Sequence, residues 1–255
     1  MSSIIGIVSK RNTVPDLLHS LQQMEQASHN SCGLMVYGRQ GDTASSTRLH
    51  RHRRAQPISV WLDPLKCSGS DARHDLNTLD KLEGQTGMGH TGQSETKRPN
   101  SMQAVLPQIS YGAKAHLNSP AKVAVVALSQ LQATSALREN LIERGYGFKS
   151  ETDSELVAHL IDATYQSHPV QAMQRTLALL TGPLAMGVMF HDQPGCLFAV
   201  QRGVPLYWYS DDERTAWASD TAALPCGLSD LKVLSEGLVL EFQNQKEHLM
   251  HRLHA

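Results

Sequence analysis

The stretch that decides the fold is LRENLIERGYGFKSETDSELVAHLI, which runs from Leu137 to Ile161. Its first part carries apolar residues at helical spacing and ends at Gly145, a residue type that commonly terminates helices. Thr152-Asp-Ser-Glu155 then forms the Ser/Thr-x-x-Glu pattern of a capping box, directly before a second apolar run. The pattern predicts a helix over 134–144 and a second helix that begins at this box.

Short apolar runs elsewhere in the chain predict β-strands. The predicted strands are Ile4–Val8, Gly33–Tyr37, Val123–Leu128, Pro183–Phe190, Cys196–Gln201, Pro205–Tyr209 and Thr215–Ala218. Two further runs, Val233–Leu234 and Leu238–Phe242, are separated by Gly237 and predict a closing hairpin. Alternation of apolar and polar residues is weak in the first and third runs, as expected for strands that are buried on both faces.

Two more helices are expected, over 15–26 and 170–180, because both segments carry leucines at helical spacing. Between residues 43 and 85 the periodic pattern breaks down, and this segment is predicted to be a loop or an insertion. Within it, the basic run Arg48–Arg54 is open to two interpretations. It can bind phosphate or an acidic partner, but a charged run is more often a solvated face, which we favour here.

Composition narrows the class of protein. The 255 residues are 40% hydrophobic and 18% charged with a formal net charge of -1, values typical of a soluble globular protein. This balance gives no reason to expect nucleic acid or an anionic membrane as a partner. No apolar run is long enough for a membrane span, and the N-terminus lacks the features of a signal peptide. Four widely spaced cysteines predict reduced thiols, so we expect a cytoplasmic location.

Two groups of histidines raise the question of a metal site. They are His50 with His52, and His248 with His251 and His254. Neither group has a carboxylate or cysteine at ligand spacing, so polar surface is the preferred interpretation. We therefore expect no metal and no cofactor.

Several segments, taken in order, resemble the glutaminase domain of class II glutamine amidotransferases. The resemblance is strongest to the N-terminal domain of the glutamine–fructose-6-phosphate aminotransferases. The segments that carry it are Ile4–Val8, Leu17–Glu25, Asn30–Leu34, Thr86–Thr91, Leu137–Tyr146, Ser150–Glu155, Arg202–Leu206, Ala218–Pro225 and Ser235–Gly237. Each segment alone is weak evidence, but their common order and spacing identify the family.

The resemblance implies an α+β fold, a four-layer αββα sandwich of the N-terminal-nucleophile hydrolase type. It covers one glutaminase-like domain over residues 1–242, followed by a C-terminal tail over 243–255. In this family an N-terminal cysteine attacks the glutamine amide, and its own α-amine serves as the base. The ammonia passes to a synthase domain, for which this chain has no matching segment.

Matching the family's site residues to this chain predicts a degenerate site. Ser2 occupies the nucleophile position. Leu128 and Ser129 replace the Asn-Gly pair of the oxyanion hole, and Leu128 has no donor. Gly92 replaces the arginine that clamps the glutamine carboxylate, and Glu95 replaces a threonine that also holds substrate. A carboxylate at that position would repel the substrate carboxylate.

Four other positions complete the comparison. Asp153 matches the aspartate that grips the glutamine amino group, although its place in the capping box also favours a purely structural role. Ala27 stands at the position of an arginine in the family. Val105 lies near the position of a family histidine in the loop that covers the substrate. Cys32 is an alternative nucleophile, but its position at the start of a strand favours a buried structural cysteine.

Two functions from different classes follow. The leading hypothesis is a catalytically degenerate protein that binds a partner for regulation or scaffolding, either a synthase-type subunit or a second copy of itself. The alternative is an N-terminal-serine amidohydrolase that uses Ser2 on a substrate other than glutamine. In the first case we expect the former site to be closed and apolar, with Leu128 and Val105 pointing into it.

Overall fold

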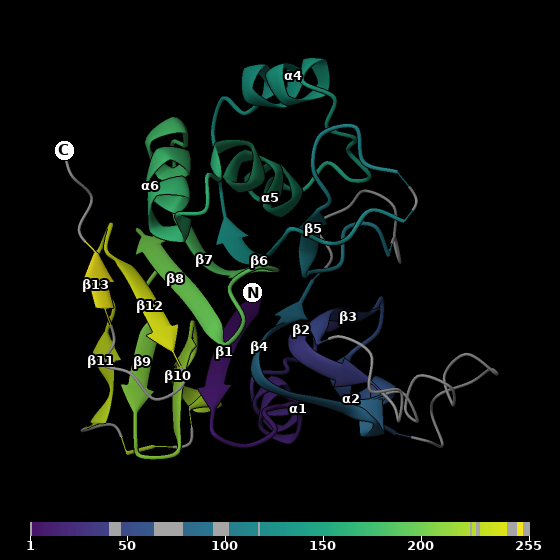
Figure 1. The fold of residues 1–255 in the computed structure, drawn as a ribbon. Helices are drawn as coiled ribbons and strands as arrows, with labels where there is room; N and C mark the ends of the chain where they lie inside the picture. The colour runs from purple at the N-terminus through teal and green to yellow at the C-terminus, as the bar shows by residue number, and fades with distance from the viewer. Residues whose placement is uncertain are drawn as a thin grey trace.

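Two β-sheets stacked face to face, with helices on both outer sides, make up the architecture (Figure 1). The computed structural model describes residues 2–40, 47–63, 79–93, 102–116, 118–224, 226–227 and 230–243, and the backbone of 249–251. No helix within these ranges is long and apolar enough to cross a membrane.

The first sheet, sheet A, has the strand order β11-β9-β10-β1-β4-β2-β3, and all its neighbours are antiparallel. Its strands are β1 (Ser3–Ser9), β2 (Ser31–Gln40), β3 (Arg48–Arg54), β4 (Leu82–Gly92), β9 (Tyr207–Ser210), β10 (Arg214–Ala218) and β11 (Lys232–Val233). The N-terminal strand β1 therefore lies in the middle of the sheet, between β10 and β4.

The second sheet, sheet B, has the order β13-β12-β8-β7-β6-β5 and is also antiparallel. Its strands are β5 (Gln108–Ser110), β6 (Val123–Ser129), β7 (Leu184–Phe190), β8 (Cys196–Arg202), β12 (Val239–Gln243) and β13 (Leu249–His251). In Figure 1, β3 and β5 end the two sheets on the same side of the molecule, and β13 lies on the other side.

Helices cover the outer face of each sheet. Sheet A is covered by α1 (Val14–Gln23) and the short α2 (Ile58–Trp61). Sheet B is covered by α5 (Asp153–Thr164) and α6 (Pro169–Leu179), and α4 (Ser135–Glu143) packs beyond α5. A short 3-10 helix, Thr221–Ala223, follows β10. The order of layers is α, β, β, α, which confirms the predicted four-layer sandwich.

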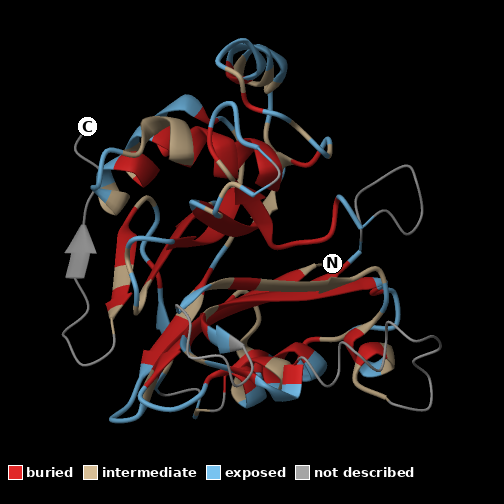
Figure 2. Cartoon of the chain, turned by 45° about the vertical axis from the view of Figure 1, so that its right-hand side comes forward, coloured by how far each residue is buried: buried red, intermediate tan, exposed pale blue. Residues whose placement is uncertain are grey.

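Three separate apolar cores fill the spaces between the four layers (Figure 2). Alternate residues of one strand enter different cores, as the two-residue period of a β-strand requires. In β1, Ile4 and Val8 face sheet B, whereas Ile5 and Ile7 face α1. Because both faces of β1 are buried, its sequence is one continuous apolar run.

Trp217 packs between the two sheets, against one glycine of each. Its indole belongs to the core between the sheets and is 1% exposed. A Cβ atom added to Gly6 of β1 or to Gly187 of β7 would collide with the indole ring. The two glycines thus provide the space for the ring, one in each sheet, and fix how closely the sheets approach.

All seven predicted single strands and all four predicted helices are present, with boundaries shifted by a few residues. The predicted closing hairpin is wrong, because β11 pairs with β9 in sheet A and β12 pairs with β8 in sheet B. Part of the predicted 43–85 loop is regular structure, since β3 and α2 lie within it. Residues 64–78 of that segment lie outside the described residues.

Strand β4 was not predicted because four glycines hide its pattern: Gly84, Gly87, Gly89 and Gly92. Glycine is depleted in strands and often marks a close approach of another segment. Here α1 makes that approach. A Cβ atom on Gly87 would lie 2.6 Å from a Leu17 methyl, and one on Gly89 would lie 3.0 Å from a Leu21 methyl.

We predict that Gly187→Ala lowers the free energy of unfolding by about 1–3 kcal/mol, because the added methyl overpacks the space that Trp217 fills. Gly147→Ala is the matched control, since a Cβ atom there meets no atom within 4 Å. Its effect should stay within about 0.5 kcal/mol. Urea unfolding followed by tryptophan fluorescence measures both, and equal effects of the two substitutions would contradict the packing argument.

Candidate functional site

The predicted site positions meet where β1, β4 and β6 end and α5 begins. Ser3 pairs with Thr91 and Ile4 with His90, so Ser2 lies opposite Gly92 on the face of sheet A that looks toward sheet B. A cavity of about 20 Å³ lies there. Its lining residues are Ser2, His90, Gln93, Ala104, Leu106, Ala127, Thr152 and Ser154. This volume is enough for about one water molecule.

Ser2 fills the place that a side chain at position 92 would need. A Cβ atom on Gly92 would collide with Oγ and Cβ of Ser2 and would lie 2.8 Å from the Ser2 Cα. Any larger residue at this position therefore requires the N-terminus to move. The missing arginine at Gly92 is a change of packing as well as a loss of charge.

The positions that match the oxyanion hole have other contacts. Leu128 is half-buried and packs against the core between the sheets. The Ser129 hydroxyl donates a hydrogen bond to Asp153 Oδ2 at 3.2 Å. Leu128 does not line the small cavity, and neither does Ser129. Of the described residues of β6, only Ala127 lines the small cavity.

Asp153 connects α5 to the end of β6. Its Oδ2 atom accepts hydrogen bonds from the Leu131 amide at 3.0 Å and from the Ser129 hydroxyl. The capping of α5 belongs to Thr152, whose hydroxyl accepts from the Glu155 amide at 3.3 Å. Asp153 is thus a structural tie between two elements, a role that the capping-box pattern did not reveal.

Among the described residues, His90 is the one buried titratable side chain that lines the small cavity. Burial, together with the nearby His29, lowers the pKa of His90 to about 3, so its imidazole is neutral near pH 7. Its Nδ1 atom has no hydrogen-bond partner among the described residues. The neighbouring His29 contacts Thr91 through Nδ1 and the threonine hydroxyl at 3.1 Å.

The remaining predicted positions lie in different places. Glu95 lies outside the described residues. Ala27 is exposed and does not line the cavity. Cys32 is fully buried, and burial raises its pKa, with a further contribution from Glu25. A buried, protonated thiol is a poor nucleophile, which agrees with the structural interpretation of this cysteine.

Val105 lies on the loop that covers the cavity, but the expectation that it points into the cavity is wrong. Leu106, one position further along, lines the small cavity instead, and the Val105 carbonyl accepts a hydrogen bond from Arg53 at 2.7 Å. The expected apolar filling is also wrong. The cavity is small, but its lining includes serine, threonine, glutamine and histidine side chains.

The two histidine groups do not come together in the described structure. His50 lies on β3 and contacts the Gly38 carbonyl at 3.2 Å, and burial lowers its pKa. His251 lies on β13, at the opposite side of the molecule (Figure 1). His248 and His254 lie outside the described residues. Within the described residues, no three histidine, cysteine or acidic side chains are placed to hold a metal ion.

Comparison with known proteins finds relatives among the glutamine amidotransferases. A family model for a glutamine amidotransferase domain matches residues 105–226. Glutamine–fructose-6-phosphate aminotransferase of Bordetella pertussis is 26% identical over 247 residues, which are 95% of this chain and 36% of that enzyme. The same enzyme of Legionella pneumophila is 29% identical over 239 residues, or 93% of this chain and 35% of the relative. The chain thus spans about a third of the length of these relatives.

Solved structures show the same fold at low sequence identity. Glutamine phosphoribosylpyrophosphate amidotransferase from B. subtilis, in complex with ADP and GMP, superposes with a TM-score of 0.73 and 17% identity. The match covers 99% of this chain and 49% of that one. A structure titled as the allosteric regulatory enzyme of purine biosynthesis matches with the same TM-score at 18% identity.

The chain is thus similar in sequence to glutamine amidotransferases of class II, and it has the N-terminal-nucleophile hydrolase fold. Within that class, the sequence is similar to the glutaminase domain of the glutamine–fructose-6-phosphate aminotransferases.

We predict that Asp153→Ala lowers the free energy of unfolding by about 1–3 kcal/mol, because the Leu131 amide loses its acceptor. Asp192→Ala is the control. That carboxylate sits in an exposed contact with Tyr165, so its removal should cost less than about 1 kcal/mol. Chemical denaturation checks both values. An unchanged stability in Asp153→Ala would show that the aspartate is free for another role.

Proposed function

We propose that this chain is a catalytically silent glutamine amidotransferase-like domain that acts as a binding module. The observation that carries the proposal is the size of the former site. A cavity of about 20 Å³ does not admit a glutamine molecule, since small-molecule sites have volumes of about 300–1,000 Å³. Ser2 itself occupies the space beside Gly92 from which a carboxylate clamp would extend.

The contacts of Leu128 and Asp153, near the small cavity, support the same proposal. A glutaminase needs hydrogen-bond donors at the developing oxyanion, and the loss of one such donor typically costs a factor of about 10²–10³ in rate. Leu128 supplies an apolar side chain there and packs into the core. Asp153 is already engaged by Ser129 and Leu131, so the charge that would hold a substrate amine has intramolecular partners.

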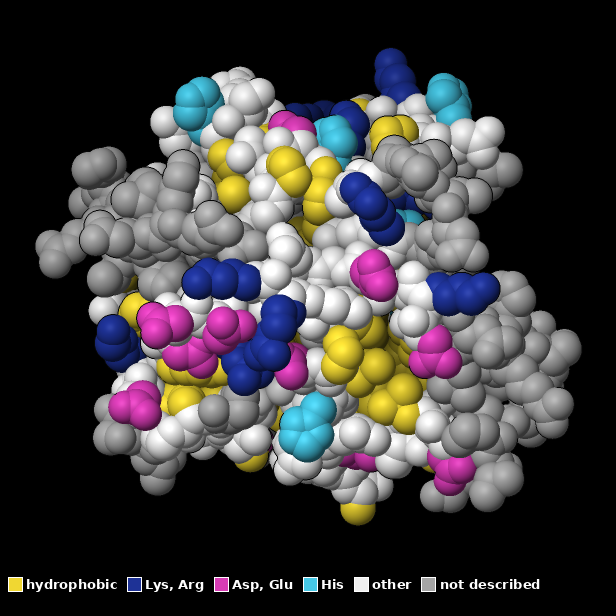
Figure 3. Space-filling model, turned by 60° about the horizontal axis from the view of Figure 1, so that its bottom comes forward, with side chains coloured by type: hydrophobic (Ala, Val, Ile, Leu, Met, Phe, Trp, Pro, Cys, Tyr) yellow, Lys and Arg dark blue, Asp and Glu magenta, His cyan; other side chains and the backbone are white. Residues whose placement is uncertain are grey.

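A protein partner fits this domain best. The curated relatives that it matches are about three times as long, and their names describe an aminotransferase that uses glutamine. A chain that retains the framework of the domain is suited to contact a synthase-type subunit or a second copy of itself. On the face shown in Figure 3, acidic and basic side chains are interspersed, an arrangement that does not favour nucleic acid. A cytoplasmic location is part of the proposal.

One observation favours a second candidate, an amidohydrolase that uses Ser2 on another substrate. Ser2 and His90 line the same small cavity, which brings an imidazole close to the serine hydroxyl. The closed cavity opposes this candidate, because a substrate would have to displace the covering residues Ala104 and Leu106.

We predict that the purified protein releases no ammonia from glutamine above the rate of buffer alone, because the clamp and the oxyanion donor are both missing. A coupled glutamate dehydrogenase assay measures the release, with Ser2→Ala as the matched control. Wild type and control should be indistinguishable. Turnover that disappears in Ser2→Ala would overturn the proposal and support the second candidate.

Restoring the family residues should not restore activity. In the triple variant Ser2→Cys, Gly92→Arg and Leu128→Asn, the new arginine collides with the N-terminal residue and the new asparagine removes apolar contacts. Leu128→Asn alone should lower stability by about 1–2 kcal/mol, since the leucine is only half-buried. Leu128→Met keeps the volume and serves as its control. Glutamine hydrolysis by the triple variant would show that the old backbone geometry is intact.

A further inference from the structure

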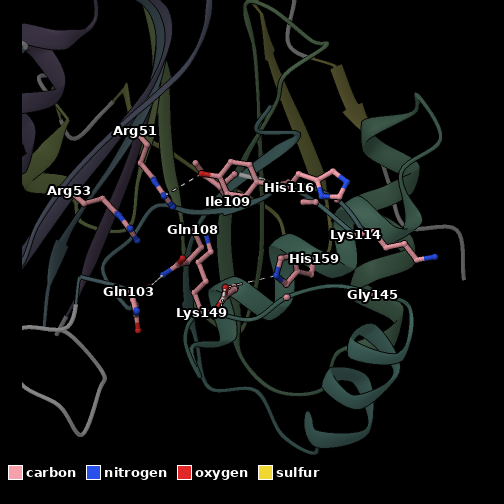
Figure 4. Close-up of a pocket in the computed structure, with 15 residues that line it drawn as sticks. Arg51, Arg53, Gln103, Gln108, Ile109, Lys114, His116, Gly145, Lys149 and His159 are labelled. Atoms are coloured by element: carbon pink, nitrogen blue, oxygen red, sulfur yellow. Dashed lines mark hydrogen bonds and ion pairs between the residues drawn. The ribbon is translucent and has the colours of Figure 1, made fainter. Parts of the chain in front are cut away.

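A second and much larger cavity, of about 380 Å³, opens at the edge of the molecule where β3 and β5 end the two sheets. Figure 4 shows its walls, which come from β3, from β5 with the turn after it, from the loop before α5 and from α5 itself. None of the residues that line it also lines the small cavity beside Ser2. The large cavity is therefore a separate site from the one on which the proposed function rests.

Two arginines of β3 project into this cavity. Arg51 and Arg53 are two positions apart, so they share the face of β3 that continues the layer between the sheets. Both are partly buried, which corrects the expectation that the basic run Arg48–Arg54 is simply a solvated face. Sequence alone could not show this, because the strand was hidden within an apparently irregular segment.

The hydrogen-bond partners of the two arginines among the described residues are neutral groups. Arg53 donates to the Val105 carbonyl at 2.7 Å, and Arg51 reaches the Pro107 carbonyl and the Tyr111 hydroxyl at 3.5 Å each. Among the described residues, no carboxylate lies within ion-pair distance of either guanidinium. Burial lowers the pKa of Arg53 to about 10, with a further contribution from Arg51, while Tyr111 and Glu155 partly offset this effect.

Lysines add to the positive charge of the cavity. The Lys149 ammonium lies over the Tyr111 ring, 5.3 Å from its centroid, and Figure 4 shows it on the same side of the cavity as the arginines. Lys114 lies on the turn after β5 and is exposed at the rim. His116 is also exposed there, while burial lowers the pKa of His159 in the wall.

Glu155, the one carboxylate among the described residues of the lining, already accepts hydrogen bonds through both of its oxygens. Its two oxygens accept from the Lys149 amide at 2.8 Å and from the amide and hydroxyl of Ser150 at 2.6 Å each. Its Oε1 atom also lies 3.9 Å from Nε2 of His159. Among the described residues, the lining thus holds two arginines and two lysines against a single carboxylate that serves the loop before α5, so it has an excess of positive charge.

From this geometry we propose that the cavity between β3, β5 and α5 binds a small phosphorylated molecule, with Arg51, Arg53 and Lys149 contacting its phosphate. Guanidinium groups match phosphate with paired donors, and a lysine ammonium adds a mobile charge. The volume lies within the range of small-ligand sites and leaves room for an organic group beside the phosphate. Tyr111 and Ile109 supply a partly apolar wall for that group.

The position of this site suggests how occupancy would act on the rest of the domain. The segment 103–109 separates the two cavities: Ala104 and Leu106 line the small one, and Gln103 and Gln108 line the large one. Arg53 holds this segment through the Val105 carbonyl. A phosphate that engages Arg53 therefore contacts the anchor of the covering loop.

Isothermal titration calorimetry with glucose 6-phosphate, glucose and inorganic phosphate, at one fixed ionic strength, tests the proposal. Glucose 6-phosphate should bind saturably, glucose should give no binding heat, and inorganic phosphate should bind at least about tenfold more weakly than the ester. Absence of saturable binding by both phosphate probes would overturn the proposal. Equal affinity for phosphate and its ester would overturn the assignment of an organic group.

Charge-neutral variants locate the binding. Arg51→Gln and Arg53→Gln should each weaken glucose 6-phosphate binding by about tenfold or more, since each removes a charged donor. Lys149→Met should weaken it as well, and it leaves the hydrogen bonds of both arginines intact if their replacement impairs folding. Arg175→Gln is the matched control, because Arg175 is exposed on α6 and does not line the cavity. Unchanged affinity in Lys149→Met and in the folded arginine variants would overturn the site.

Discussion

The packing of Trp217 between the two sheets is the constraint on which the rest of the structure depends. The indole fits only because Gly6 and Gly187 have no side chains, one in each sheet. This contact fixes the separation of the sheets, and with it the relative positions of the ends of β1 and β6. The small cavity lies at the end of β1, and the basic cavity lies at the β3–β5 edge beside α5.

Within that framework, local packing leaves little space next to Ser2. Ser2 lies against the backbone of Gly92, and Leu106 of the covering loop lies over the remaining space. Asp153 is bonded to the end of β6 instead of facing the cavity. The domain thus has the arrangement of elements seen in the similar amidotransferase structures, with little free space beside Ser2.

Most helices and strands could be predicted from the sequence, because capping patterns and apolar runs are local features of the chain. Thr152 caps α5 as the Ser/Thr-x-x-Glu pattern predicts, and apolar runs such as Ile4–Val8 are strands buried on both faces. The failures arose where tertiary contacts decide. Glycines conceal β4 because α1 packs on them, and Leu238–Phe242 joins sheet B because its apolar side chains complete the core between the sheets.

The site was harder to predict than the fold, since a residue type does not reveal its partners. Asp153 matched a substrate-binding position and a capping pattern, yet its hydrogen bonds tie two elements together. Arg51 and Arg53 belonged to a basic run that is typical of solvated surface, and only the pairing of β3 with β2 turns them toward sheet B. Such roles depend on contacts between segments far apart in the chain.

The central claim is that the former glutamine site is closed. Titration of the wild-type protein with L-glutamine to millimolar concentration, followed by calorimetry, tests it most directly. The account predicts heats equal to those of dilution, because a cavity of about 20 Å³ holds no more than about one water molecule. Saturable glutamine binding that is lost in Asp153→Ala would contradict it, and would show that the site opens to accept its ancestral ligand.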